Sequence, residues 1–437
     1  MSSIDLQPYI NKLDDIEPIV TKGMVKDISG LVIAATGPMV PIGNVCLIHN
    51  KAGSVIRSEV VGFGNGRVLL MPLGEMEGIS AGDLVESAGK CLTIPVSNSL
   101  LGRTLSGLGE PIDGKGDIIV QKRVPVYAQP PNPLLRDRIT KHLGVGVKAI
   151  DGCLTLGRGQ RVGIFAGSGV GKSTLLGMIA RNTEADINVI ALVGERGREV
   201  RDFIEKSLGE EGLKRSVVVV ATSDQPALIR IKAVLTATAI AEYFRDQGKD
   251  VLLMMDSITR FAMAQREVGL TIGEPPTTKG YPPSVFAMLP KFLERAGTSD
   301  KGSITGIYTV LVDSDDMNEP IADASRSILD GHIVLERKIA AKNIWPAIDV
   351  LGSLSRVMPD VVTKDHMKAN YKLRELMAAH RDAEDLINIG AYAPGSNPKI
   401  DEAIKKMGGI LSFVTQGMDE SYDYDKEVSM LKAAVGS

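Results

Sequence analysis

The chain has 437 residues, which leaves room for two or three domains, and its 44% apolar and 24% charged residues are a usual globular mix. A formal charge of −3 lacks the strong basic excess of a dedicated nucleic-acid binder. The three cysteines fit neither a disulfide framework nor a metal site, and no apolar run is long enough to cross a bilayer. Without a signal-peptide pattern, we expect an intracellular protein with no nucleic-acid partner.

Residues 4–17 are predicted to form a short amphipathic helix. Their apolar side chains recur at intervals of three or four, and their polar face is mainly acidic. A membrane-surface helix would be basic on that face, so a protein partner is one interpretation and docking on the chain's own domain is the other. We treat residues 1–20 as a separate, partner-binding N-terminal helix.

A small β-barrel is predicted for residues 21–93. Short β-rich runs at 30–33, 45–48, 60–63 and 68–71 follow one another closely, with glycines and no helical segment between them. The proline-rich stretch at 125–133 is then predicted to be an extended crossing segment.

A mostly parallel sheet covered by helices is predicted within residues 94–360. Strands at 161–166, 187–193, 216–221, 251–255 and 304–312 alternate with helices at 171–182, 199–208, 226–247 and 257–268. Residues 361–437 are predicted to form a C-terminal helical domain, with helices at 364–389 and 399–412. The fold class is therefore α/β: an N-terminal barrel, a central parallel-sheet domain and a helical C-terminal domain.

A phosphate-binding loop is the strongest motif. Residues 166–174 read AGSGVGKST, follow an apolar strand and open a helix, with Ala166 in the place of the usual first glycine. Backbone N–H groups of such a loop surround a phosphate, Lys172 reaches the β- and γ-phosphates, and Ser173 ligates Mg²⁺. The predicted nucleotide-binding residues here are Gly167, Ser168, Gly169, Val170, Gly171, Lys172, Ser173 and Thr174.

Two carboxylates follow other strands of the predicted sheet. Asp256 follows the apolar run 251–255, which is the position of the Mg²⁺-holding acid in P-loop enzymes. It could instead cap the next helix. Glu195 follows the strand at 187–193, and the carboxyl ends of parallel strands face the ligand crevice. It could polarise the attacking water there, or be a surface glutamate in a salt bridge. Arg196, its neighbour, is a further catalytic candidate.

Three strings carry a family resemblance: 157–165 before the phosphate loop, 280–297, and 324–333. Together they resemble the type III protein-export ATPases, relatives of the F-type and V-type rotary catalytic subunits. The strings LMPL at 70–73 and LLGR at 100–103 are closer to the flagellar branch. The resemblance implies that the central domain is a RecA-like P-loop ATPase domain, and that the chain binds ATP or ADP with Mg²⁺.

The resemblance also implies residue roles. Glu195 matches the family's catalytic glutamate, and Arg356 matches the arginine that reaches into the neighbouring subunit's site. Trp345 falls where relatives place an aromatic that stacks on adenine, with core packing as the alternative. Tyr392 is a weaker candidate for the other side of the ring. One chain with both Glu195 and Arg356 suits a homo-oligomeric ring, which we expect to be a hexamer.

The implied partners follow the same family. We expect an export regulator or stator protein at the N-terminal helix, and a central stalk with export substrates or chaperones at the C-terminal domain. The protein would be cytoplasmic, in peripheral contact with the membrane export gate at the inner membrane. The alternatives are an injectisome ATPase, a rotary ATP synthase catalytic subunit, an RNA translocase with the same core, and a nucleotide-bound scaffold. An RNA translocase would need barrel aromatics, and residues 24–93 offer only Phe63.

Overall fold

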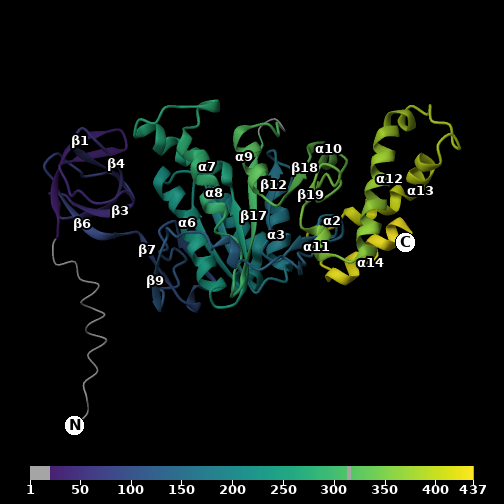
Figure 1. The fold of residues 1–437 in the computed structure, drawn as a ribbon, viewed down its shortest axis with the longest axis horizontal. Coiled ribbons are helices and arrows are strands. Elements are labelled where there is room, and N and C mark those ends of the chain that lie inside the picture. Colours follow the sequence, from purple (N-terminus) through teal and green to yellow (C-terminus); the bar gives the residue numbers. More distant parts are fainter. Residues whose placement is uncertain (1–19, 313–315, 437) are drawn as a thin grey trace, which may run out of the picture.

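The structure, a computed structural model, describes residues 20–312 and 316–436. The helix predicted at 4–17 lies outside the described residues. Three parts follow one another along the long axis: a barrel, a central sheet with helices on both faces, and a group of C-terminal helices (Figure 1). This arrangement confirms the predicted fold class. Within the described ranges, no helix is both long enough and apolar enough to cross a membrane.

The N-terminal barrel is closed, which leaves none of its strands with an unpaired edge. Its strand order is β1-β2-β5-β4-β3-β6, and nine buried apolar side chains from all six strands fill it. The sequence pattern had indicated only four of these strands. The strands are β1 (Lys22–Ser29), β2 (Val32–Ala35), β3 (Asn44–His49), β4 (Val55–Gly64), β5 (Arg67–Pro72) and β6 (Leu84–Cys91).

The central sheet has nine strands, and all neighbours from β8 to β18 are parallel. The order is β19-β18-β12-β17-β15-β13-β14-β8, with β16 paired to β17; β16 and β19 run antiparallel. The strands are β8 (Arg103–Ser106), β12 (Arg161–Ala166), β13 (Ile187–Val193), β14 (Ser216–Ala221), β15 (Asp250–Asp256), β16 (Gly297–Thr298), β17 (Ser303–Leu311), β18 (Gly331–Leu335) and β19 (Leu354–Ser355).

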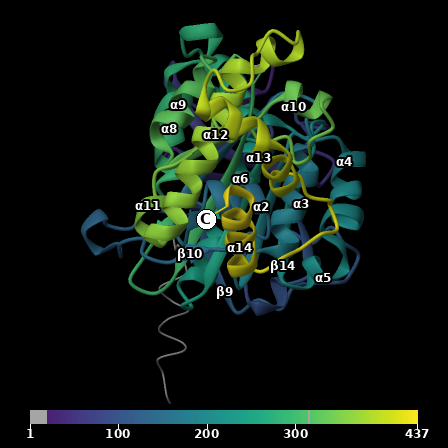
Figure 2. The same ribbon diagram turned by 90° about the vertical axis from the view of Figure 1, so that its right-hand side faces the viewer.

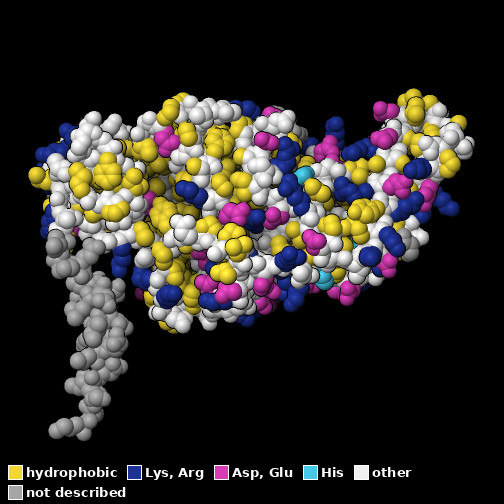
Figure 3. Space-filling view, in the orientation of Figure 1, with side chains coloured by type: hydrophobic (Ala, Val, Ile, Leu, Met, Phe, Trp, Pro, Cys, Tyr) yellow, Lys and Arg dark blue, Asp and Glu magenta, His cyan; other side chains and the backbone are white. Residues whose placement is uncertain are grey.

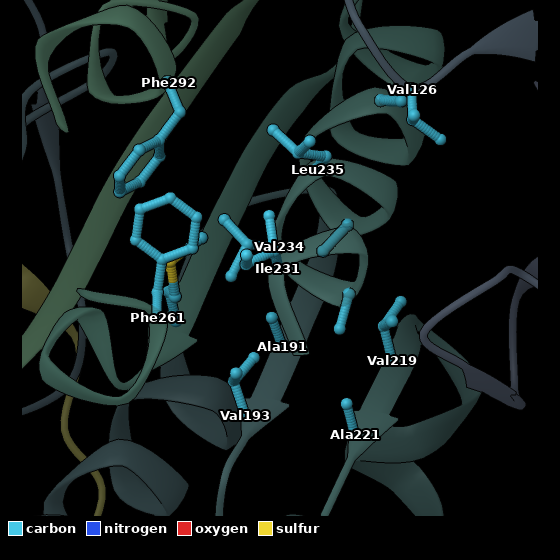
Figure 4. Close-up of a cluster of buried hydrophobic side chains, with 14 of the residues drawn as sticks. Val126, Ala191, Val193, Val219, Ala221, Ile231, Val234, Leu235, Phe261 and Phe292 are labelled. Atoms are coloured by element: carbon cyan, nitrogen blue, oxygen red, sulfur yellow. The ribbon is translucent and has the colours of Figure 1, made fainter. Parts of the chain in front are cut away.

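Both faces of this sheet are buried, which is why its strands are almost continuously apolar. Side chains alternate between two hydrophobic clusters: Ala191 of β13 belongs to one and Leu192 to the other. Figure 4 shows the first cluster, where Ala191 and Val219 face Val234 of α6, with Phe261 and Phe292 beside them.

Helices cover both faces of the sheet (Figure 2). On one face α6 is buried along most of its length, as its long run of apolar residues requires. The helices are α2 (Lys148–Cys153), α3 (Lys172–Asn182), α4 (Gly197–Asp202), α5 (Gly209–Lys214), α6 (Ala227–Arg245), α7 (Ile258–Thr271), α8 (Pro283–Leu293), α9 (Pro320–Ile328), α10 (Arg337–Ala341) and α11 (Met358–Val361), and a π-helical turn (Phe203–Leu208) joins α4 to α5.

The segment between barrel and sheet is ordered by short pairings. Strands β7 (Thr93–Val96) and β9 (Lys122–Pro125) pair with each other, and β10 (His142–Leu143) pairs with β11 (Leu156–Gly157). Between β7 and β9 the chain supplies β8 to the central sheet. Arg103 of β8 binds Asp113 through two hydrogen bonds of 2.8 and 2.9 Å. This contact first, and backbone N–H donors with it, hold the pKa of Asp113 well below its usual range.

A buried ion pair fixes the barrel to the central domain. Lys232 of α6 is fully buried, and its Nζ lies 2.6 Å from Oε2 of Glu59 on β4. The same ammonium lies over the ring of Tyr127, 4.4 Å from its centroid. Removing either partner would leave an uncompensated buried charge, so the barrel and the central domain each supply one half of this pair.

The C-terminal part has three helices: α12 (Lys364–Asn388), α13 (Pro398–Val414) and α14 (Tyr424–Val435). The first two were predicted, and α14 was not. Side-chain oxygens of Thr363, Asn397 and Asp423 accept hydrogen bonds from the first-turn N–H groups of these helices, as N-caps do. Apolar side chains of all three helices join the sheet cluster that includes α3, so they pack on the central domain.

Candidate active site

The phosphate loop lies between β12, which ends at Ala166, and α3, which begins at Lys172. Gly169 and Gly171 have φ values of 80° and 83°, a conformation that side chains disfavour and that turns the backbone around a central point. This loop lines a cavity of about 630 Å³. The other lining residues come from the chain after β13 and β14, from the end of β17 and the residue after it, and from the first turn of α7. Strand ends therefore converge here, as the parallel order predicts.

Lys172 is held between the two predicted carboxylates. Its Nζ lies 2.5 Å from Oδ1 of Asp256 and 3.5 Å from Oε1 of Glu195. Burial opposes the ammonium charge, but the two negative charges outweigh it and raise the pKa of Lys172. Burial and then the charge of Asp256 raise the pKa of Glu195 to about 7. A carboxyl with such a pKa can exchange a proton near neutral pH.

Asp256 is a buried group with its own positioning contact. It ends β15, is 4% exposed, and accepts a 2.7 Å hydrogen bond from the hydroxyl of Thr309 on β17. The cap of α7 is Ser257, whose side chain accepts from the N–H of Arg260, so Asp256 does not cap this helix. Ser173, in the first turn of α3, lines the same cavity.

Arg196 lies at the rim of the cavity. Its side chain is 83% exposed, and its Nη1 lies 3.2 Å from Oε1 of Glu199. Two polar lining residues had no signal in the sequence: Ser223, after β14, and Arg260, in the first turn of α7. The Nε of Arg260 is buried without a hydrogen-bond partner. Only the position of these side chains in space reveals them.

The indole of Trp345 packs on the end of the phosphate loop. A Cβ built on Gly171 would lie 2.9 Å from Cζ3 of the ring, and the residue is 37% exposed. The carbonyl of Trp345 accepts a 2.7 Å hydrogen bond from the N–H of Gln416. The structure does not bring Tyr392 to this place. The hydroxyl of Tyr392 bonds to Asn397 and Asp401 in and after the connection between α12 and α13.

Arg356 lies at the opposite edge of the sheet. Its N–H donates to the carbonyl of Asp330, which precedes β18 and is level with Arg161 at the start of β12. The phosphate loop follows the end of β12, about 17 Å away at the usual rise of a strand. The guanidinium is exposed and forms no hydrogen bond or ion pair with the residues that the structure describes. Arg356 therefore does not line its own chain's cavity.

Family models match three parts of the chain. The beta-barrel domain of the ATP synthase alpha/beta family matches residues 25–89, and the nucleotide-binding domain of that family matches 146–355. The C-terminal domain of the type III secretion ATPase EscN matches 362–433.

Curated relatives match along nearly the whole chain. The flagellum-specific ATP synthase of Bacillus subtilis is 57% identical, over 99% of both chains. The type 3 secretion system ATPase of Xanthomonas euvesicatoria is 52% identical, over 94% of this chain and 93% of its own.

A solved structure has the same fold. The assembled ATPase EscN of the enteropathogenic Escherichia coli type III secretion system has a TM-score of 0.90 at 48% identity, over 94% of this chain and all of its own. The nucleotide-binding family model and these relatives make the chain an ATPase. The chain belongs to the family of flagellum-specific and type III secretion ATPases, within the ATP synthase alpha/beta family.

Proposed function

We propose that the chain hydrolyses Mg²⁺-ATP in a homo-hexameric ring and that each site is completed by Arg356 of a neighbouring copy. The observation that carries this proposal is the separation of the catalytic groups. Lys172, Glu195 and Asp256 lie together at the carboxyl edge of the sheet, and Arg356 lies unpaired at the amino edge. A head-to-tail contact between copies joins these edges and closes a ring.

In this proposal the phosphate loop and Lys172 bind the phosphates, and Ser173 and Asp256 hold Mg²⁺. Because the metal ion in P-loop enzymes bridges β- and γ-phosphate oxygens, Mg²⁺ in this proposal binds together with the nucleotide. Glu195 orients and polarises the attacking water. Arg356 of the next copy supplies a planar cation for the charge that develops on the transferred phosphoryl group.

The nucleotide base is assigned to the exposed face of Trp345, beside Gly171. An indole offers a broad stacking surface next to the phosphate loop. Tyr392 stays only a sequence hypothesis for this role, since its hydroxyl is bonded within the C-terminal part.

The biological role that we propose is to energise or prime protein export through a type III apparatus, in the flagellar system. The Bacillus subtilis relative is named flagellum-specific, whereas the Xanthomonas relative belongs to a type 3 secretion system, which keeps the injectisome as the alternative. A rotary ATP synthase subunit is the second alternative; failure to form active rings without a second subunit type would favour it.

We propose partners at both ends of the chain. EscN has been solved in complex with its central stalk EscO, which supports a stalk protein, with export substrates or chaperones, at α12–α14 here. An export regulator or stator would bind residues 1–20. The protein would act in the cytoplasm, in peripheral contact with the export gate. Loss of stalk binding on removal of residues 361–437 tests the first of these contacts.

Mixing inactive variants tests the shared site. Glu195→Gln and Arg356→Ala are each expected to be nearly inactive, and random co-assembly leaves about a quarter of interfaces with both wild-type groups. Mixing should therefore restore ATPase activity. Lys172→Ala is the matched control: it should be rescued by Arg356→Ala, and not by Glu195→Gln, which alters the same edge. If the mixture is inactive although its two proteins are shown to co-assemble, or if Arg356→Ala alone is fully active, the assignment of Arg356 to the neighbouring site is refuted.

A further inference from the structure

Two adjacent leucines are exposed on the amino edge of the central domain. Leu134 is 92% exposed and Leu135 is 68% exposed, in a short 3-10 turn at Pro133–Leu135. Single exposed apolar residues are common, but two neighbours at a projecting tip form a site for contact. We name residues 132–135 the leucine turn.

The leucine turn is held in place by a contact within it and by contacts of the residue that follows it. Within it, the side chain of Asn132 accepts a 3.0 Å hydrogen bond from the N–H of Leu134. Directly after it, Arg136 donates to the carbonyls of Ala296, at 2.8 Å, and of Glu294. A fixed apolar tip loses little conformational entropy when it docks, which favours a role in binding.

The leucine turn shares its edge of the sheet with Arg356. Arg136 and Arg161 both pair with Glu294, Arg161 also pairs with Asp330, and the carbonyl of Asp330 accepts from the N–H of Arg356. A continuous set of polar contacts therefore connects the leucine turn with the arginine.

Apolar packing connects the same two places. A Cβ built on Gly157 would touch both Ile139, four residues after the turn, and Val357, next to Arg356. In Figure 2 a blue segment projects at the left of the molecule beside α11, which begins at Met358. Figure 3 shows hydrophobic side chains gathered over the central domain, with charged ones between them.

We infer that the leucine turn docks on a second copy of this chain, at the carboxyl edge that receives Arg356. This inference rests on the proposed function, because it takes the ring contact to be head-to-tail. If Arg356 of one copy enters the next copy's cavity, the surface around Arg356 lies in or beside the interface between the two copies. Two desolvated leucines would supply apolar contact next to a charged group that must be placed accurately.

The test uses the full chain with both leucines replaced, Leu134→Asp with Leu135→Asp. Both side chains are exposed, so the fold and the thermal unfolding midpoint should be unchanged. Burial of even one leucine changes a binding constant about tenfold or more. We expect the concentration needed for assembly, followed by light scattering, and for half-maximal ATPase activity to rise at least about tenfold. Ile389→Asp, at a site 75% exposed in the C-terminal part, is the matched control and should assemble like the wild type.

A complementation assay then shows at which edge of the domain the leucine turn acts. The double-leucine variant keeps an intact carboxyl edge, so Glu195→Gln, which keeps the leucine turn and Arg356, should restore its activity. Arg356→Ala should not restore that activity, because it is altered at the same amino edge as the double-leucine variant. Wild-type assembly and activity of the leucine variant, or rescue by Arg356→Ala alone, would overturn the inference. Failure of the Glu195→Gln and Arg356→Ala mixture would instead overturn the shared-site proposal itself.

Discussion

Two carboxyl groups meet where the last helix packs on the central domain. Asp151 of α2 and Glu427 of α14 are both fully buried. Asp151 accepts backbone hydrogen bonds of 2.9 Å from Val145 and 2.8 Å from Gly146, so it is the partner that carries the charge. Glu427, which feels the charge of Asp151, keeps its proton. Burial first, and the charge of Asp151 next, raise the pKa of Glu427 to about 10.

This raised pKa makes the stability of the folded chain depend on pH. The unfolded chain loses the Glu427 proton near the ordinary glutamate pKa, whereas the folded chain keeps it to alkaline pH. The contribution to stability is therefore complete below the unfolded pKa and decreases as pH rises, by about 1.4 kcal/mol per pH unit. From pH 7 to 9 the free energy of unfolding should fall by about 3 kcal/mol through this group.

Glu427→Gln removes this dependence, because the amide has a similar size and does not titrate. Lys148, Glu184 and Asp423, the other charged groups beside the pair, are present in both proteins. Urea unfolding at pH 7 and 9 can be followed by the fluorescence of Trp345, the single tryptophan. Glu420→Gln, an exposed acid nearby, is the control. If wild type and Glu427→Gln lose equal stability between the two pH values, the reasoning is wrong.

Three other outcomes follow from the described contacts. The raised pKa of Glu195, about 7, means that ATP hydrolysis should increase with pH through that value as the carboxylate forms; a flat kcat from pH 6 to 8 would contradict the role of Glu195. Lys232→Met should lower the free energy of unfolding by about 3–5 kcal/mol in urea, and adding Glu59→Met should recover part of the loss. ADP should change the emission of Trp345, and an unchanged spectrum at saturating ADP would exclude stacking on its ring.

The barrel and the parallel sheet could be predicted because their apolar patterns are local. Helix α14 was missed because a buried position on its inner face is Glu427, which interrupts the apolar stripe made by Val428 and Leu431. Strand β8 was missed for another reason. It has only four residues, and its partner β14 lies over one hundred residues later, so no local pattern marks the pair.

The candidate site was predictable where its residues follow strands. Lys172, Asp256 and Glu195 come together because carboxyl ends of parallel strands share one edge. Thr309 lies inside a strand, and its bond to Asp256 depends on which strands are neighbours. The place of Tyr392 depends on how α12 and α13 pack, which periodicity does not determine.

Strand β8 has a consequence for how this molecule can be divided. The nucleotide-binding family model begins at residue 146, but the outer strand of the sheet comes from Arg103–Ser106. A fragment that starts at residue 146 would leave β14, whose six residues are all buried, as a bare edge. Unpaired N–H and C=O groups on an apolar strand are a template for aggregation. A soluble nucleotide-binding fragment should therefore start before Arg103 and include Asp113, which binds the Arg103 side chain of β8.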